Sequence, residues 1–72
     1  EIYRVPLPPE LAGETCRWLV RRLNTERQAI LLAVDRNGAL HINPGGSFAL
    51  EQADALFVVA RSRPGQLEEL AD

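Results

Sequence analysis

The chain has 72 residues, which fits a single domain that buries only roughly 60–65% of its unfolded surface. Eight arginines and no lysine stand against ten acidic residues, and the resulting net charge of −2 disfavours nucleic acid as a partner. A hydrophobic share of 46% excludes a disordered segment. One cysteine, Cys16, and one histidine, His41, are too few for an internal disulfide or a structural zinc site. Self-association therefore remains as the way to supplement a small core.

Three features of the chain bear on its location and origin. The longest apolar run covers only residues 29 to 34, far short of the roughly 20 residues that cross a bilayer. No export signal opens the chain and a single cysteine is typical of a reducing compartment, so we expect a cytoplasmic location. Because Glu1 already begins a strand-like alternation, we expect a domain excised from a larger protein.

The first third of the chain predicts a strand followed by an amphipathic helix. Residues 2 to 5 include three β-formers, and the prolines from Pro6 onward end the strand. From Gly13, apolar residues recur at the spacing of one helix face, at Cys16, Leu19, Val20 and Leu23. We expect this helix to end near Asn24. Trp18 falls on the opposite face among arginines, either as a half-exposed packing residue or as part of an interface.

The middle of the chain predicts two strands joined by a tight turn. Residues 29 to 34 are apolar throughout, which indicates a central strand buried on both faces. Asn37 and Gly38 are the strongest short hairpin signal, because a type I′ turn needs positive φ at both central residues. Residues 39 to 43 then alternate and predict a half-exposed strand that stops at the turn residues 44 to 46.

The last third of the chain predicts another buried strand and a short helix. Residues 55 to 60 form a second all-apolar run. Pro64 suits the start of a closing helix that turns Leu67 and Leu70 inward. The fold class is thus α+β: a single small domain with a mixed β-sheet, an early amphipathic helix and a short C-terminal helix.

The residues give no sign of a catalytic centre. His41 and Ser47 are close in sequence, but no strained nucleophile turn surrounds Ser47, so a surface histidine is the simpler interpretation. Cys16 lies on the apolar helix face, as a core residue does rather than a reactive thiol. Glu68 and Glu69 are adjacent on a helix and point apart. We therefore expect no enzyme activity and no metal site.

A polar edge beside the hairpin is the one candidate for ligand binding. Arg36, His41 and Asn43 come from two paired strands and their turn, while Pro44 and Gly45 expose backbone groups next to them. Such an edge suits a small ligand, and plain solvation of a hairpin is the alternative.

Five segments occur in an order that matches a known family over nearly the whole chain. They are residues 11 to 15 opening a helix, residues 29 to 34, Arg36-Asn37-Gly38, His41-Ile42-Asn43-Pro44, and residues 50 to 59. In this order and spacing the chain resembles the RCK C-terminal domain, also called RCK_C or TrkA-C. One departure is Gln52-Ala53, where the family usually has an acidic or small residue and glycine before the aspartate.

The resemblance implies a cytosolic regulatory domain of a potassium channel or transporter, or of another membrane ion carrier, that dimerises and transmits ligand binding to the gate. In relatives that bind cyclic di-AMP, the ligand lies at the dimer interface against apolar strand residues, a hairpin arginine and an Asn-Pro segment. The matching positions here are Ile30, Leu31, Arg36, Ile42, Asn43 and Pro44. Other members bind metal ions or no known ligand, so a nucleotide or a divalent cation also stays open.

Two functions follow from the resemblance. The first is ligand-sensing regulation of a potassium channel or transport system by a homodimer at the inner face of the membrane. The second is a ligand-free structural dimerisation module of another membrane ion transporter or exchanger. In both, the membrane-embedded part belongs to the same or an associated protein, and the domain itself neither inserts into the membrane nor binds nucleic acid.

Overall fold

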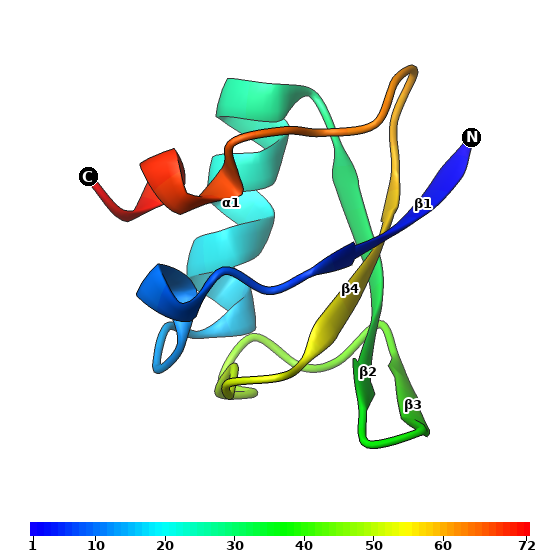
Figure 1. Ribbon diagram of the computed structural model, residues 1–72, viewed down its shortest axis with the longest axis vertical. Helices are drawn as coiled ribbons and strands as arrows, with labels where there is room; N and C mark the ends of the chain where they lie inside the picture. The colour runs from blue at the N-terminus through cyan, green and yellow to red at the C-terminus, as the bar shows by residue number, and fades with distance from the viewer.

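The computed structural model describes all 72 residues. The elements in chain order, with η for a 3₁₀ helix, are β1 (Ile2–Pro6), η1 (Pro9–Leu11), α1 (Cys16–Arg27), β2 (Ile30–Arg36), β3 (Ala39–Ile42), β4 (Ala55–Val59) and η2 (Leu67–Ala71). The helix and both 3₁₀ turns lie on one side of a four-stranded sheet (Figure 1). This arrangement confirms the predicted α+β class. No helix is both long enough and apolar enough to span a bilayer.

The sheet is antiparallel throughout, so the expectation of a mixed sheet is wrong. The strand order is β1-β4-β2-β3, and every neighbouring pair runs antiparallel. β1 and β2 do run parallel to each other, but β4 lies between them and pairs with both. The apolar strand β4 thus takes a central position where both of its edges are hydrogen-bonded, as its continuous apolar sequence favours.

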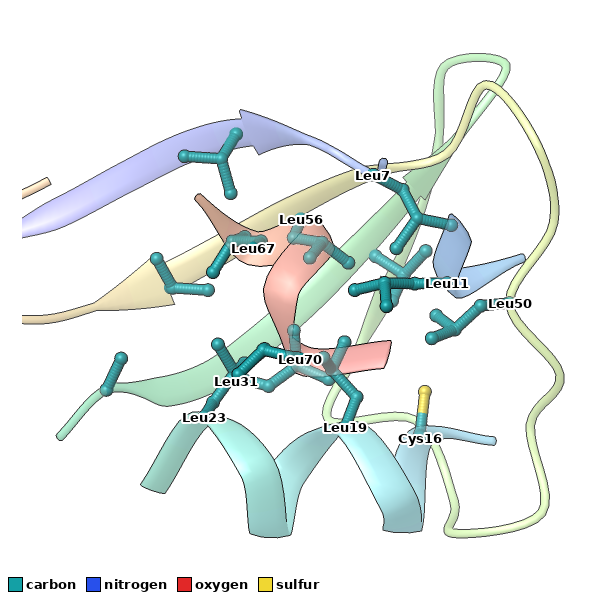
Figure 2. Close-up of a cluster of buried hydrophobic side chains, with 14 of the residues drawn as sticks. Leu7, Leu11, Cys16, Leu19, Leu23, Leu31, Leu50, Leu56, Leu67 and Leu70 are labelled. Carbon is teal, nitrogen blue, oxygen red and sulfur yellow. The ribbon is translucent and has the colours of Figure 1, made fainter. Parts of the chain in front are cut away.

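One hydrophobic core of 15 buried residues fills the space between the sheet and the helical side. Figure 2 shows Leu19 and Leu23 of α1 pointing toward Leu31 of β2 and Leu70 of η2. Leu67 is buried as well, so both leucines predicted to face inward do so. They belong to a five-residue 3₁₀ helix, which is the short C-terminal helix that the sequence predicts.

The helix α1 extends one turn beyond the predicted end at Asn24. It ends at Arg27, because Gln28 adopts the left-handed conformation with φ of 52° and its N–H still reaches a carbonyl of the last turn. An ion pair of 2.7 Å between Arg22 and Glu26, four residues apart, supports the added turn. Asparagine is only a weak stop signal when a supporting pair spans it.

Two expectations of burial are wrong. Val20 was predicted on the buried face of α1 but is 45% exposed. Residues 29 to 34 were predicted to be buried on both faces, yet Ile30 is 59% and Leu32 is 37% exposed. The cause is that helical elements cover only one face of the sheet, which buries Leu31 and Val34 and leaves the opposite face of β2 open.

The predicted hairpin joins β2 and β3. Asn37 and Gly38 have φ angles of 53° and 85°, as a turn with two positive φ angles requires, and Arg36 pairs with Ala39 across it. A register shift at Leu32 marks a β-bulge in β2. The hairpin positions the polar edge that the sequence singled out.

Candidate functional site

The face of the sheet turned away from α1 is open to solvent and apolar except for one ion pair of 3.2 Å between Arg4 and Asp35. Exposed aliphatic side chains come from three of its strands, and their exposed fractions run from 37% for Leu32 to 68% for Ile42. Six hydrophobic residues line a shallow hollow of about 360 Å³ on it: Ile2, Leu32, Ala33, Leu40, Ile42 and Phe57. We call these residues together with Ile30 and Val59 the outer sheet face.

Strand pairing explains why these side chains gather. Ile42 of β3 lies opposite Ala33 of β2, which lies opposite Phe57 of β4, so three apolar side chains form a row that Arg4 of β1 completes. A second row joins Ile30, Val59 and Ile2. Contiguous apolar surface of this kind is rare on monomers and marks an interaction site. The geometry therefore provides an open, shallowly hollowed apolar surface that suits a second protein surface.

Arg36 lies at the turn end of β2 and is held by several contacts within the chain. Its Nε donates to Asp54 Oδ1 at 3.0 Å, and its Nη2 donates to Asp54 Oδ2 at 2.9 Å and to the Ala49 carbonyl at 2.7 Å. Its Nη1 lies 3.2 Å from Glu51 Oε2. Its guanidinium carbon lies 4.6 Å from the ring centroid of Phe48. The arginine thus ties β2 to the segment that leads into β4.

Asp54 is the only buried charged or polar residue, with 2% of its surface exposed. It accepts a further hydrogen bond of 2.9 Å from the Glu51 N–H. Burial by itself raises the pKa of the carboxyl, but the hydrogen bonds from Arg36 and Glu51 and the charge of Arg36 outweigh burial. The pKa of Asp54 therefore lies below its ordinary value of 3.8. The pair is ionised at neutral pH.

Four of the six predicted ligand residues lie at one end of the β2–β3 pair. Ile30 and Ile42 belong to the outer sheet face. Asn43 and Pro44 follow β3 directly, and the Asn43 N–H donates to the Leu32 carbonyl at 2.8 Å. Asn43 is exposed and has a φ of 48°. Apolar side chains and an exposed amide are thereby placed next to each other.

The other two predicted ligand residues lie elsewhere. Leu31 is only 7% exposed and points into the core. Arg36 pairs with Ala39 at the turn, four residues along β2 from Leu32. At about 3.3 Å per residue this separation is roughly 13 Å. The arginine therefore stands apart from the Asn-Pro segment within one copy of the chain.

The remaining reactive side chains are distributed without a common centre. No group of three histidine, cysteine or carboxylate side chains lies close enough to hold a metal ion. Cys16 is buried, and burial, together with the negative charge of Asp54, raises the pKa of its thiol. The ring of His41 packs 5.0 Å from that of Phe48.

Sequence reasoning missed the roles of Asp54 and Phe48 and the exposure of the sheet. Asp54 stands 18 residues after Arg36, and no local pattern links the two. Residues 29 to 34 are apolar throughout, so the sequence has no alternation there that could indicate the open face. Ile2 belongs to this face only because β1 pairs with β4, and the sequence does not indicate that pairing.

Comparison with known proteins gives a likeness at the level of structure. No family model and no curated protein sequence matches the chain. Among solved structures, the RCK_C domain dimer of S. agalactiae BusR in complex with c-di-AMP matches with a TM-score of 0.68 and 22% identity, over 85% of this chain and 80% of that one. The chain has the RCK_C fold. This confirms the resemblance found in the sequence.

Two further solved structures have the same fold in a longer chain. S. agalactiae BusR in complex with its busAB-promotor DNA matches with a TM-score of 0.69 and 22% identity, over 85% of this chain and 30% of that one. The GsuK RCK domain structure matches with a TM-score of 0.70 and 24% identity, over 97% of this chain and 15% of that one. The RCK_C fold described here is thus a minor part of both longer chains.

Proposed function

We propose that this RCK_C domain is a regulatory domain that dimerises through its outer sheet face and senses a small ligand. Its setting is the cytoplasmic side of a potassium channel or transport system. The observation that carries the proposal is the outer sheet face, an apolar surface that no other part of the chain covers. The similar domain of BusR, which is a dimer in complex with c-di-AMP, supports it.

Dimerisation follows from the energetics of the uncovered side chains. Ile2, Ile30, Leu40 and Ile42 are each more than half exposed. Full burial of an aliphatic side chain of this size contributes about 1.5–3 kcal/mol. A twofold axis lets the same patch face its own copy, so one surface is sufficient for both partners. A homodimer thereby adds apolar burial that a 72-residue core lacks.

We propose c-di-AMP as the ligand, bound where the outer sheet face meets the Asn-Pro segment. Ile30, Ile42 and Pro44 offer apolar contacts to an adenine face, and the Asn43 amide offers both donors and an acceptor to its edge. Leu31 packs beneath these residues and shapes the strand rather than touching the ligand.

The proposed part of Arg36 is to contact a phosphate of the ligand across the dimer, because within one copy it stands roughly 13 Å from the Asn-Pro segment. Asp54 holds one side of its guanidinium, whereas Nη1 faces Glu51, whose side chain is 62% exposed. A phosphate that displaces the exposed Glu51 carboxylate gains a charge-assisted contact without disturbing the buried pair.

A ligand-free structural dimerisation module of another ion transporter or exchanger is the second candidate. The observation that favours it is the saturation of Arg36, which already contacts Asp54, Ala49 and Glu51. In both candidates the domain is no enzyme. Its net charge of −2 gives it no general attraction for nucleic acid.

Titration calorimetry with c-di-AMP, ATP and Mg²⁺ tests the two candidates. We expect c-di-AMP to bind with one ligand for two chains, and Asn43→Ala to weaken binding by about tenfold, because a lost hydrogen bond costs about 1 kcal/mol or more. Asn24→Ala on α1 is the matched control and should leave the affinity unchanged. If none of the three ligands produces heat with the wild-type dimer, the structural module is the correct function.

A further inference from the structure

A second surface lies on α1, the helix that covers the side of the sheet opposite the outer sheet face (Figure 1). Arg17, Trp18, Arg21 and Arg22 form it, and together with Thr15 they line a hollow of about 420 Å³. We call these four residues the α1 basic surface. Because α1 covers the other side of the sheet, dimerisation through the outer sheet face leaves this surface free.

Charge is unevenly distributed between this helix and the rest of the chain. The helix α1 contains four arginines and one glutamate, whereas the remaining residues contain four arginines and nine acids. An acidic protein thus presents one strongly basic helix. Such a local field attracts an acidic partner even though the net charge of the whole chain is negative.

Two of the arginines lack any partner in the chain. The side chains of Arg17 and Arg21 form neither an ion pair nor a hydrogen bond, in contrast to Arg22, which pairs with Glu26 at 2.7 Å. They stand one helical turn apart, where like charges repel. Gly46 leaves room for the Arg17 guanidinium, because a Cβ at position 46 would lie 2.9 Å from Arg17 Nη2. Both guanidinium groups are therefore available to an external carboxylate.

Trp18 gives the same surface an apolar centre. One part of its ring packs against the core, and the guanidinium carbon of Arg22 lies 5.3 Å from the ring centroid. Its indole N–H donates to no atom of the chain. Tryptophan and arginine are the residue types that dominate the binding energy of protein interfaces.

We propose that the α1 basic surface docks an acidic segment of a protein partner. Carboxylates of that segment bind Arg17 and Arg21, each of which can hold a carboxylate through two parallel N–H groups, and an apolar side chain packs on Trp18. Nucleic acid fits less well, because Glu14 precedes the helix and Glu26 lies in its last turn. The docking does not depend on which ligand the outer sheet face binds.

The fluorescence of Trp18 offers a direct test, because it is the only tryptophan of the chain. The probe is a synthetic peptide that alternates glutamate and leucine. We expect a saturable change in emission, and a loss of about tenfold or more in affinity for the double variant Arg17→Gln with Arg21→Gln. The double variant Arg61→Gln with Arg63→Gln has the same net charge and should bind the peptide as the wild type does.

Three results would overturn the proposal. The first is an emission that stays constant with the acidic peptide. The second is an equal loss of affinity in both double variants, which would mean that only the net charge matters. The third is tighter binding of a single-stranded oligonucleotide than of the peptide, which would assign the surface to nucleic acid. Circular dichroism of each variant confirms that the helix is intact.

Discussion

At the scale of single residues, the Arg36–Asp54 pair holds the segment before β4 against β2. Both nitrogens of one side of the guanidinium contact the carboxylate, at 3.0 and 2.9 Å. The carboxylate is almost fully buried, so removing the arginine would leave an uncompensated charge in the core at a cost of about 3–5 kcal/mol. The pair is therefore a structural requirement for any role of Arg36 in ligand binding.

The pair makes stability depend on pH in a defined direction. The folded state lowers the pKa of Asp54 below 3.8, so the unfolded state binds its proton more readily. The contribution of ionised Asp54 to the free energy of unfolding is complete well above pH 3.8. It is lost as the pH falls through that value toward the pKa of the folded state. We expect urea denaturation between about pH 7 and pH 3 to show that the free energy of unfolding falls more steeply for the wild type than for Asp54→Asn. Parallel pH profiles would contradict this account.

The sequence could supply only one half of this pair. Arg36 stands out because it opens the hairpin, and it was predicted as a ligand residue on that ground. Asp54 lies in the segment before β4, where no local pattern in the sequence indicates a partner for its carboxylate. The two meet because β4 pairs with β2, with Asp35 opposite Ala55, and that register is a property of the whole sheet.

At the scale of elements, the β2–β3 hairpin depends on one glycine. Gly38 has a φ of +85°, which a β-branched residue adopts only at a cost of about 1–3 kcal/mol. Gly65 is a matched control, because it has no such φ and, like Gly38, no atom within 4 Å of an added Cβ. We expect thermal denaturation to show a large fall in melting temperature for Gly38→Val and little change in melting temperature for Gly65→Val. Equal losses would mean that side-chain bulk, not the turn, sets the cost.

Local patterns predicted the elements better than they predicted their arrangement. The hairpin was predictable because its turn type demands particular residues, and the face of α1 because Cys16, Leu19 and Leu23 follow the helical period. The strand order β1-β4-β2-β3 was not predictable, because β4 pairs with residues that lie 20 or more positions earlier in the chain. The mixed sheet was wrong for this reason, whereas the doubly buried β2 was wrong because helical elements cover only one face of the sheet.

At the scale of the whole molecule, two different surfaces lie on opposite sides of one thin domain. The outer sheet face is apolar and suits a second copy of the chain. The α1 basic surface is charged and suits an acidic segment of another protein. In the proposed function, one side of the domain dimerises and the other side is left free to dock the acidic segment.

Sedimentation equilibrium of the wild type and of Ile42→Glu tests dimerisation through the outer sheet face most directly. Ile42 is 68% exposed on the edge strand β3 of this face, so a charge there should leave the fold intact and prevent association. Val20→Glu, at a 45% exposed position on α1, is the matched control. At tens of micromolar we expect dimers for the wild type and for Val20→Glu, and a monomer with an unchanged circular dichroism spectrum for Ile42→Glu. A monomeric wild type, or a dimer that survives Ile42→Glu, would contradict the account.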